Sequence, residues 1–247
     1  MKSFATLCLA AVAVSSPLML VEHTEIETAT RLESRQTGAI AKEFTQGGCR
    51  DVIFIFARGS TEVGNMVRLP PRTWRLGLGI KTRIRNGGSI VGPPTSNGLK
   101  KRYSDSKVAT EGVDYAAALT TNFLPGGADP VGIDEMKRLL TDATGKCTNS
   151  KIVAGGYSQG AAVAHRAIES LPDAAKSKIL GVVSYGDTQN RQDNGQILNF
   201  PKDRVKIICN DGDKVCDGTL EIQPAHLDYE RRVPEAVEFL TGKIGNI

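Results

Sequence analysis

The most restrictive feature of the sequence is a strand, a glycine-bounded turn and a helix in direct succession between residues 151 and 171. The run Lys151 to Gly155 has the apolar composition of a buried strand, and Ser158 to Leu171 has a helical pattern. The pentapeptide GYSQG joins them at residues 156–160. Its glycines permit a strained turn in which strand and helix approach closely, so the hydroxyl of Ser158 stands above the sheet. This segment predicts an α/β fold with a serine nucleophile at a strand-to-helix turn.

Three further apolar runs have the composition of strands buried on both faces, at Val52–Ala57, Ile179–Tyr185 and Arg204–Cys209. Helical patterns lie between or after them, at Val131–Thr144 and Pro234–Ile244. Strands that alternate with helices predict a mostly parallel sheet with right-handed crossovers and helices on both faces. A chain of 247 residues is long enough for one such domain.

The N-terminus has the pattern of an export signal rather than of a core helix. Met1 and Lys2 precede an apolar run that closes in small residues and is too short to span a bilayer. We therefore interpret residues 1–16 as a signal peptide and residues 17–35 as a propeptide cut after Arg35. The remaining domain, residues 36–247, is expected to be secreted, and no other segment has the pattern of a membrane span.

Four cysteines remain once Cys8 is assigned to the signal peptide. An even number of cysteines in an exported chain predicts two disulfides. Their spacing favours a bridge between Cys209 and Cys216, which leaves Cys49 to pair with Cys147. A zinc site is the less favoured alternative, because CxxC spacing and nearby histidines are absent from the sequence around them.

Residues 67–90 do not fit the pattern of strands and helices. They carry six Arg or Lys residues and no acidic residue, although the rest of the domain is nearly neutral. A nucleic-acid partner is not expected, because the positive charge is local and is not interleaved with aromatic residues. A surface loop remains one interpretation of the segment.

A serine hydroxyl needs a base and a group that orients the base. Of the three histidines, His23 lies in the leader, and His165 lies within the helix after Ser158, where a partly exposed structural role is expected. His226 is therefore the candidate base. The chain order of serine, acid and histidine in this kind of fold requires the acid to lie between residues 158 and 226.

Asp213 is the best candidate for that acid, because the predicted Cys209–Cys216 bridge would clamp its short loop at the end of a strand. Asp187, Asp211 and Asp217 are the alternatives.

Ester hydrolysis also requires donors for the negative charge that develops on the carbonyl oxygen. The backbone N–H of Gln159, next to the nucleophile, is one candidate. Ser60, in the loop after the first strand, can offer both a backbone N–H and a hydroxyl.

Four motifs together resemble the fungal cutinases: ARGSTE at 57–62, GGYSQGAA at 155–162, CNDGDKVC at 209–216 and PAH at 224–226. The resemblance extends over residues 45–245, apart from the Arg-rich segment. It implies a single-domain, lidless α/β-hydrolase with a serine open to solvent. It also implies that Ser60 and Gln159 form the oxyanion hole and that Asn122 orients Ser60.

The resemblance further implies two apolar loops beside the site that suit acyl chains of an insoluble polyester. Their residues here are Leu119, Phe123, Leu124, Leu220 and Ile222. Glu221 and Gln223 depart from the family pattern in this rim, which leaves the preferred chain length open. Cutinase-like sequences also pass almost directly from the GNM at 64–66 to VGPPTSNGLKK, so residues 67–90 are best explained as a retained intron of the gene model.

We therefore expect a monomeric esterase that hydrolyses cutin and short or medium acyl esters through an acyl-enzyme on Ser158. No metal or organic cofactor is expected. A carbohydrate esterase of the acetylxylan type is one alternative. A noncatalytic secreted protein is another, because residues 67–90, if translated, begin shortly after Ser60 and could displace the oxyanion loop.

Overall fold

A computed structural model describes residues 36–66 and 91–247. The predicted signal peptide, the predicted propeptide and the Arg-rich segment 67–90 lie outside the described residues. The part of the chain that begins at Gln36 forms one compact unit. In it the five strands make a single sheet with the order β2-β1-β3-β4-β5.

All four strand pairings of this sheet are parallel. The strands are β1 (Val52–Ala57), β2 (Val108–Gly112), β3 (Lys151–Tyr157), β4 (Ile179–Tyr185) and β5 (Val205–Ile208). The main helices are α3 (Gly92–Tyr103), α4 (Pro130–Lys146), α5 (Gln159–Glu169) and α7 (Val233–Ile244). Shorter helices are α2 (Glu43–Gly47), α6 (Asp173–Lys176), η2 (Asp105–Lys107), η3 (Leu119–Phe123), η4 (Lys202–Arg204), η5 (Pro224–Leu227) and η6 (Glu230–Arg232).

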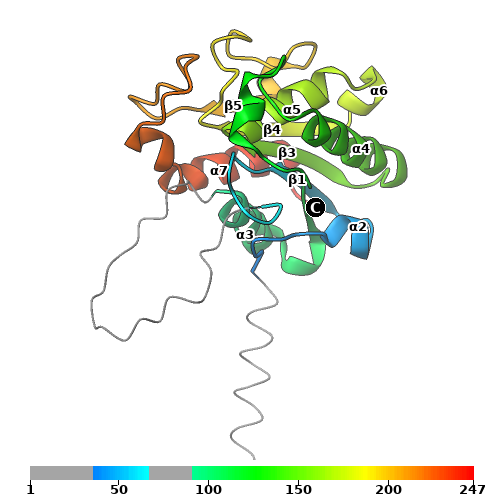
Figure 1. Ribbon diagram of the computed structural model, residues 1–247. Helices are drawn as coiled ribbons and strands as arrows, with labels where there is room; N and C mark the ends of the chain where they lie inside the picture. Colours follow the sequence, from blue (N-terminus) through cyan, green and yellow to red (C-terminus); the bar gives the residue numbers. More distant parts are fainter. Residues whose placement is uncertain (1–35, 67–90) are drawn as a thin grey trace, which may run out of the picture. The chain divides into compact units, whose positions relative to one another are not determined.

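Helices cover both faces of the sheet. Alternate side chains of a strand point to opposite faces, so an apolar strand such as β1 has side chains to bury on each side. Ile53 and Ile55 of β1 pack in the core beneath α4 and α5. Phe54 and Phe56 pack in the second core, with residues of α3 and α7. Figure 1 shows α4 and α5 on one side of the sheet and α3 and α7 on the other. The predicted layered α/β architecture is confirmed.

Strand β2 was absent from the sequence prediction, because its sequence, VATEG, contains Thr110 and Glu111 and so forms no apolar run. It forms the edge of the sheet, and all five of its residues are buried. The Glu111 carboxylate accepts hydrogen bonds from the backbone N–H groups of Phe44 and Thr45, at 3.1 and 3.0 Å. A polar residue is therefore buried here with partners from α2, which the local pattern could not reveal.

Two disulfides connect the four cysteines of the described chain as predicted, Cys49 with Cys147 and Cys209 with Cys216. The zinc interpretation is therefore wrong, because the thiolates it requires are joined to each other. Among residues 36–66 and 91–247, the helices are too short or too polar to cross a bilayer.

Candidate active site

Ser158 occupies the turn between β3 and α5 with a strained backbone, φ 54° and ψ −119°. The Ser158 N–H donates to the carbonyl of Tyr185 at the end of β4, at 2.9 Å. The flanking glycines make this turn possible. A Cβ on Gly156 would lie 2.1 Å from the Gly160 carbonyl oxygen, and one on Gly160 would lie 2.0 Å from that of Ala57. The turn therefore depends on backbone contacts that only glycine permits.

His226 lies in η5 and bridges the serine and the candidate acid. Its Nε2 is 3.0 Å from Ser158 Oγ, and its Nδ1 is 2.9 Å from Asp213 Oδ2. The Tyr157 hydroxyl donates to the His226 carbonyl at 2.8 Å, and the two rings stack with their centroids 5.3 Å apart. The imidazole is thus held on three sides, with one nitrogen toward Ser158 Oγ and the other toward the Asp213 carboxylate.

Asp213 is the acidic residue, among the four considered, that lies within hydrogen-bonding distance of His226. Asp211 and Asp217 are exposed, and Asp187 bonds to a different histidine. Burial alone would raise the pKa of Asp213, but hydrogen bonds from His226 and Tyr229 outweigh burial and hold the pKa below its usual value. The carboxylate is therefore ionised at neutral pH, as a partner of an imidazolium must be.

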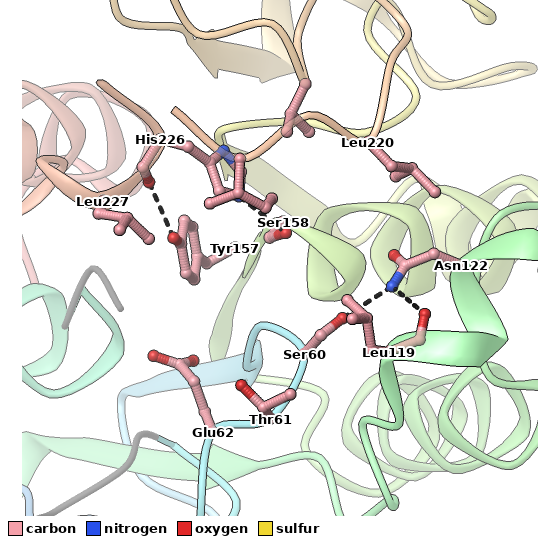
Figure 2. A pocket seen from close by; sticks show the side chains of 12 residues that line it. Ser60, Thr61, Glu62, Leu119, Asn122, Tyr157, Ser158, Leu220, His226 and Leu227 are labelled. Carbon is pink, nitrogen blue, oxygen red and sulfur yellow. Dashed lines mark hydrogen bonds between the residues drawn. The ribbon is translucent and has the colours of Figure 1, made fainter. Parts of the chain in front are cut away.

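The candidate oxyanion residues lie across the pocket from His226. Asn122 Nδ2 donates to Ser60 Oγ at 2.9 Å and to the Leu119 carbonyl at 2.8 Å, which orients the Ser60 hydroxyl (Figure 2). Gln159 is the first residue of α5, so its backbone N–H lacks a partner in a preceding turn of that helix. Its side chain donates to the Ala118 carbonyl at 2.8 Å. Both residues are positioned to offer donors beside Ser158.

A pocket joins these polar groups to an apolar wall (Figure 2). Three of the five predicted rim residues, Leu119, Leu220 and Ile222, line it. Phe123 and Leu124 are exposed but do not line the pocket, and the Phe123 side chain is 76% exposed. The apolar lining is completed by Tyr157, Val215 and Leu227. The arrangement can hold an acyl chain against apolar side chains while its carbonyl meets the serine.

Comparison with known proteins identifies the family. The family model named cutinase matches residues 80–244. Probable cutinase 1 of Aspergillus niger is 43% identical over 240 residues, which cover 96% of this chain and 81% of the relative. Cutinase CUT2 of Pyricularia oryzae is 40% identical over 243 residues, 98% of each protein. The chain belongs to the cutinase family.

Solved structures agree with this family assignment. Trichoderma reesei cutinase, in complex with a phosphonate inhibitor, matches with a TM-score of 0.68 and 27% identity, over 92% of this chain and 88% of that one. An acetylxylan esterase matches with a TM-score of 0.55 at 18% identity, over 80% of this chain and 100% of that one, and is alike in fold alone. Members of the cutinase family are carboxylic ester hydrolases, and this chain is an enzyme of that class.

Two expectations drawn from the cutinase resemblance need refinement. Ser158 was expected to be open to solvent, but it is only 8% exposed and is reached through the pocket. Glu221 and Gln223 do not line the pocket, and the Gln223 amide donates to the Glu221 carboxylate instead. Since Leu220 and Ile222 alternate with them, the apolar side chains of this segment face the site. The two departures therefore leave the apolar wall of the pocket unchanged.

Tyr229 is a buried partner of the candidate acid that the sequence analysis missed. Its hydroxyl donates to Asp213 Oδ2 at 2.6 Å and accepts from the Asn210 N–H at 2.9 Å. Burial, and then the nearby Asp213 carboxylate, raise the pKa of Tyr229, so the phenol remains a donor. Its ring also meets the His226 ring edge-on, with centroids 6.2 Å apart.

Glu62 is the second missed residue, and it lines the pocket (Figure 2). Its carboxyl accepts from the Gly59 N–H at 2.7 Å, and its carbonyl accepts from Arg58 Nε at 2.6 Å. Burial raises the pKa of Glu62 to about 8, against the opposing effects of the Gly59 N–H and the Arg58 charge. The group is therefore mostly protonated at neutral pH, beside the loop that carries Ser60.

The expectation that His165 is partly exposed is wrong. Its side chain is 0% exposed and lies between the carboxylates of Asp187 and Asp193. Helix α5 is buried along most of its length. The chain after β4 covers His165, which the helix sequence alone suggests would face solvent.

Proposed function

We propose that this chain is an exported serine esterase that hydrolyses cutin and short or medium acyl esters. The observation that carries the proposal is the continuous chain of contacts from Ser158 Oγ through His226 to Asp213, at 3.0 and 2.9 Å. At the Ser158 end, these contacts open onto a pocket that Ser158 and His226 line and that has an apolar wall. The relatives named as cutinases supply the substrate class.

In the first half-reaction, Ser158 Oγ attacks the ester carbonyl carbon while His226 Nε2 takes the hydroxyl proton. Asp213 keeps the Nδ1 proton of the ring in place and stabilises the imidazolium. His226 then gives its proton to the departing alcohol oxygen, and the acyl group stays on the serine. A water molecule completes hydrolysis by the same route, so the serine is regenerated.

The developing negative charge on the carbonyl oxygen is stabilised by Ser60 and by the backbone N–H of Gln159. Each donor of this kind contributes about 3 to 4 kcal/mol to catalysis in related chemistry. The bond from Asn122 to Ser60 Oγ holds that hydroxyl in one orientation. Because the donors are already in place, little reorganisation is required when the charge appears.

The substrate assignment is tested by comparing three substrates: a purified cutin, p-nitrophenyl butyrate and acetylated xylan. We expect turnover of the first two, because the wall of Leu119, Leu220 and Ile222 favours acyl chains over a hydrated polysaccharide. Ser158→Ala is the control and should remove turnover while the protein remains folded. A marked preference for acetylated xylan would overturn the substrate assignment.

Export is part of the proposal, and it rests on the pattern of residues 1–16 and on the two disulfides. N-terminal sequencing of the protein recovered from the culture medium of an expressing fungus tests it. A terminus within residues 17–36 is expected, and retention of the full chain inside the cells would contradict it.

A further inference from the structure

A buried cluster of charged side chains joins α5, the helix that follows Ser158, to the segment after β4. Its residues are not among those used in ester hydrolysis. His165 Nε2 is 2.8 Å from Asp187 Oδ2, and its Nδ1 is 2.7 Å from Asp193 Oδ2. Arg166 binds Asp193 and also Glu169, the latter at 2.9 Å. Asp187 and Asp193 are the charged groups that act on His165, and Arg166 and Glu169 extend the cluster. The cluster comes from α5 and from the segment after β4.

The contacts of His165 favour a ring that carries two protons. A neutral imidazole has one N–H donor and one acceptor nitrogen, but here both ring nitrogens meet carboxylate oxygens. Burial alone would lower the pKa of His165, but the two carboxylates outweigh burial and raise it to about 9. The imidazolium is therefore a double donor at neutral pH.

The segment that His165 holds contacts both the nucleophile and the base. Gly186, before Asp187, has φ +51°, and a Cβ on it would lie 2.8 Å from His226 Cε1. Thr188, after Asp187, points its hydroxyl at the Ser158 carbonyl, at 3.5 Å. Asp187 Oδ1 also accepts from the Gln189 N–H at 2.8 Å, which closes the turn. Displacement of Asp187 would therefore move the wall behind His226 and the support beneath Ser158.

We propose that the His165 imidazolium is a positioning residue for ester hydrolysis: by binding Asp187, it holds the Gly186–Thr188 segment against His226 and Ser158. The inference rests on the proposed roles of Ser158 and His226. Asp193 contacts the other side of the ring and supports the charge, but it is not in the segment that contacts His226.

The protonation state is measured by NMR titration of the imidazole nitrogens in the ¹⁵N-labelled protein from pH 5 to pH 10. The His165 signals are assigned by their loss in His165→Gln. We expect His165 to remain doubly protonated at pH 8, and Asp187→Asn to lower its midpoint by roughly one to three pH units. A wild-type midpoint near the ordinary histidine value would overturn the proposal. This readout does not depend on esterase activity, so it is separate from failure of the proposed function.

The positioning role is measured by comparing Asp187→Asn with the matched variant Asp193→Asn at pH 7. Both remove one carboxylate from His165, but only Asp187 lies between Gly186 and Thr188. We expect Asp187→Asn to lower kcat on p-nitrophenyl butyrate by about tenfold to a hundredfold with little change in KM, and Asp193→Asn to have a smaller effect. Equal kcat in both variants and the wild type would overturn the proposal.

If Asp187→Asn does not fold, the NMR titration of the wild-type protein tests the positioning role instead. The amide signals of Gly186 and Thr188 should then shift with the same midpoint as His165. Shifts that do not follow that midpoint would contradict the proposal.

Discussion

The Tyr229 hydroxyl donates to Asp213 Oδ2 at 2.6 Å, on the same carboxylate that accepts from His226 Nδ1. The Val215 N–H donates to Asp213 Oδ1 at 3.0 Å. The carboxylate is therefore held by three donors, one from its own loop and two from residues 226–229, and only the base among them belongs to the predicted triad. A residue that the motifs do not include thus fixes the orientation of the candidate acid.

Tyr229→Phe removes one of these donors without changing the ring. We expect a loss of about 1.5 to 3 kcal/mol in the free energy of unfolding at pH 7, because the lost bond is to a charged group. The lowered pKa of Asp213 stabilises the fold above the ordinary value of 3.8, and this contribution disappears as the pH falls. Urea unfolding at pH 7 and pH 3 should therefore give a smaller loss at pH 3.

The matched control is Tyr103→Phe, whose hydroxyl donates to the Gly245 carbonyl at 2.8 Å, away from the pocket. It should leave kcat unchanged, whereas Tyr229→Phe should lower it. An equal stability loss at both pH values, together with an unchanged kcat in Tyr229→Phe, would show that the phenol does not act through Asp213.

Glu62→Gln keeps an acceptor for the Gly59 N–H but removes the titrating proton. Because the pKa of Glu62 is raised from 4.5 to about 8, the unfolded chain releases a proton that the folded protein retains between these values. Stability of the wild type should fall as the pH rises through this interval. We expect the variant to be more stable than the wild type by about 5 kcal/mol at pH 9 and equal to it near pH 4.

Ionised Glu62 would also oppose the charge on the oxyanion, so wild-type kcat should decline above pH 8 more steeply than that of Glu62→Gln. Glu111→Gln is the comparison, since that buried carboxyl has a raised pKa but lies outside the pocket. Parallel pH profiles of the wild type and Glu62→Gln would contradict this effect on catalysis.

Removal of the two disulfides should have different effects on stability and on kcat. In the chain-entropy model, the Cys49–Cys147 bridge, which spans 98 residues, contributes about 4 to 5 kcal/mol. The Cys209–Cys216 bridge spans 7 residues and contributes about 2 to 3 kcal/mol, but it encloses Asp213. Paired Cys→Ser variants, compared by thermal unfolding and by kcat, should show the larger stability loss for the first bridge and the larger activity loss for the second. The reverse order would contradict this account of the loop.

Deletion of residues 67–90 should leave a folded, active enzyme. A Cβ on Gly92 would lie 2.9 Å from the Met66 carbonyl oxygen, so the chain ends on either side of the segment lie close together. Expression with and without the segment, and transcript sequencing across it, test the retained-intron hypothesis. Loss of folding or activity on deletion, or continuous coding sequence in the transcript, would refute it.

Local patterns were sufficient for the strand-to-helix turn and most of the strands. The apolar run Val52–Ala57 coincides with β1, and Ile179–Tyr185 coincides with β4. Burial on both faces makes such runs conspicuous in the sequence. The turn at Ser158 was predictable because its glycines, strand and helix are adjacent in the chain.

Interactions between distant residues were not predictable in this way. His165 meets Asp187 only because α5 and the end of β4 lie side by side in the fold, and Asp187 had been considered only as an alternative acid. Tyr229 and Glu62 stand in polar loops whose sequence gives no sign of burial. A weak signal existed for Glu62, since it ends the ARGSTE motif whose serine was singled out.

Covalent labelling shows directly whether Ser158 is the nucleophile. The protein is incubated with a p-nitrophenyl alkylphosphonate, and the modified peptide is located by mass spectrometry. We expect one phosphonyl group on Ser158, loss of esterase activity in proportion to labelling, and no adduct in Ser158→Ala. Full inactivation with the phosphonyl group on another residue, or an active Ser158→Ala enzyme, would contradict this assignment.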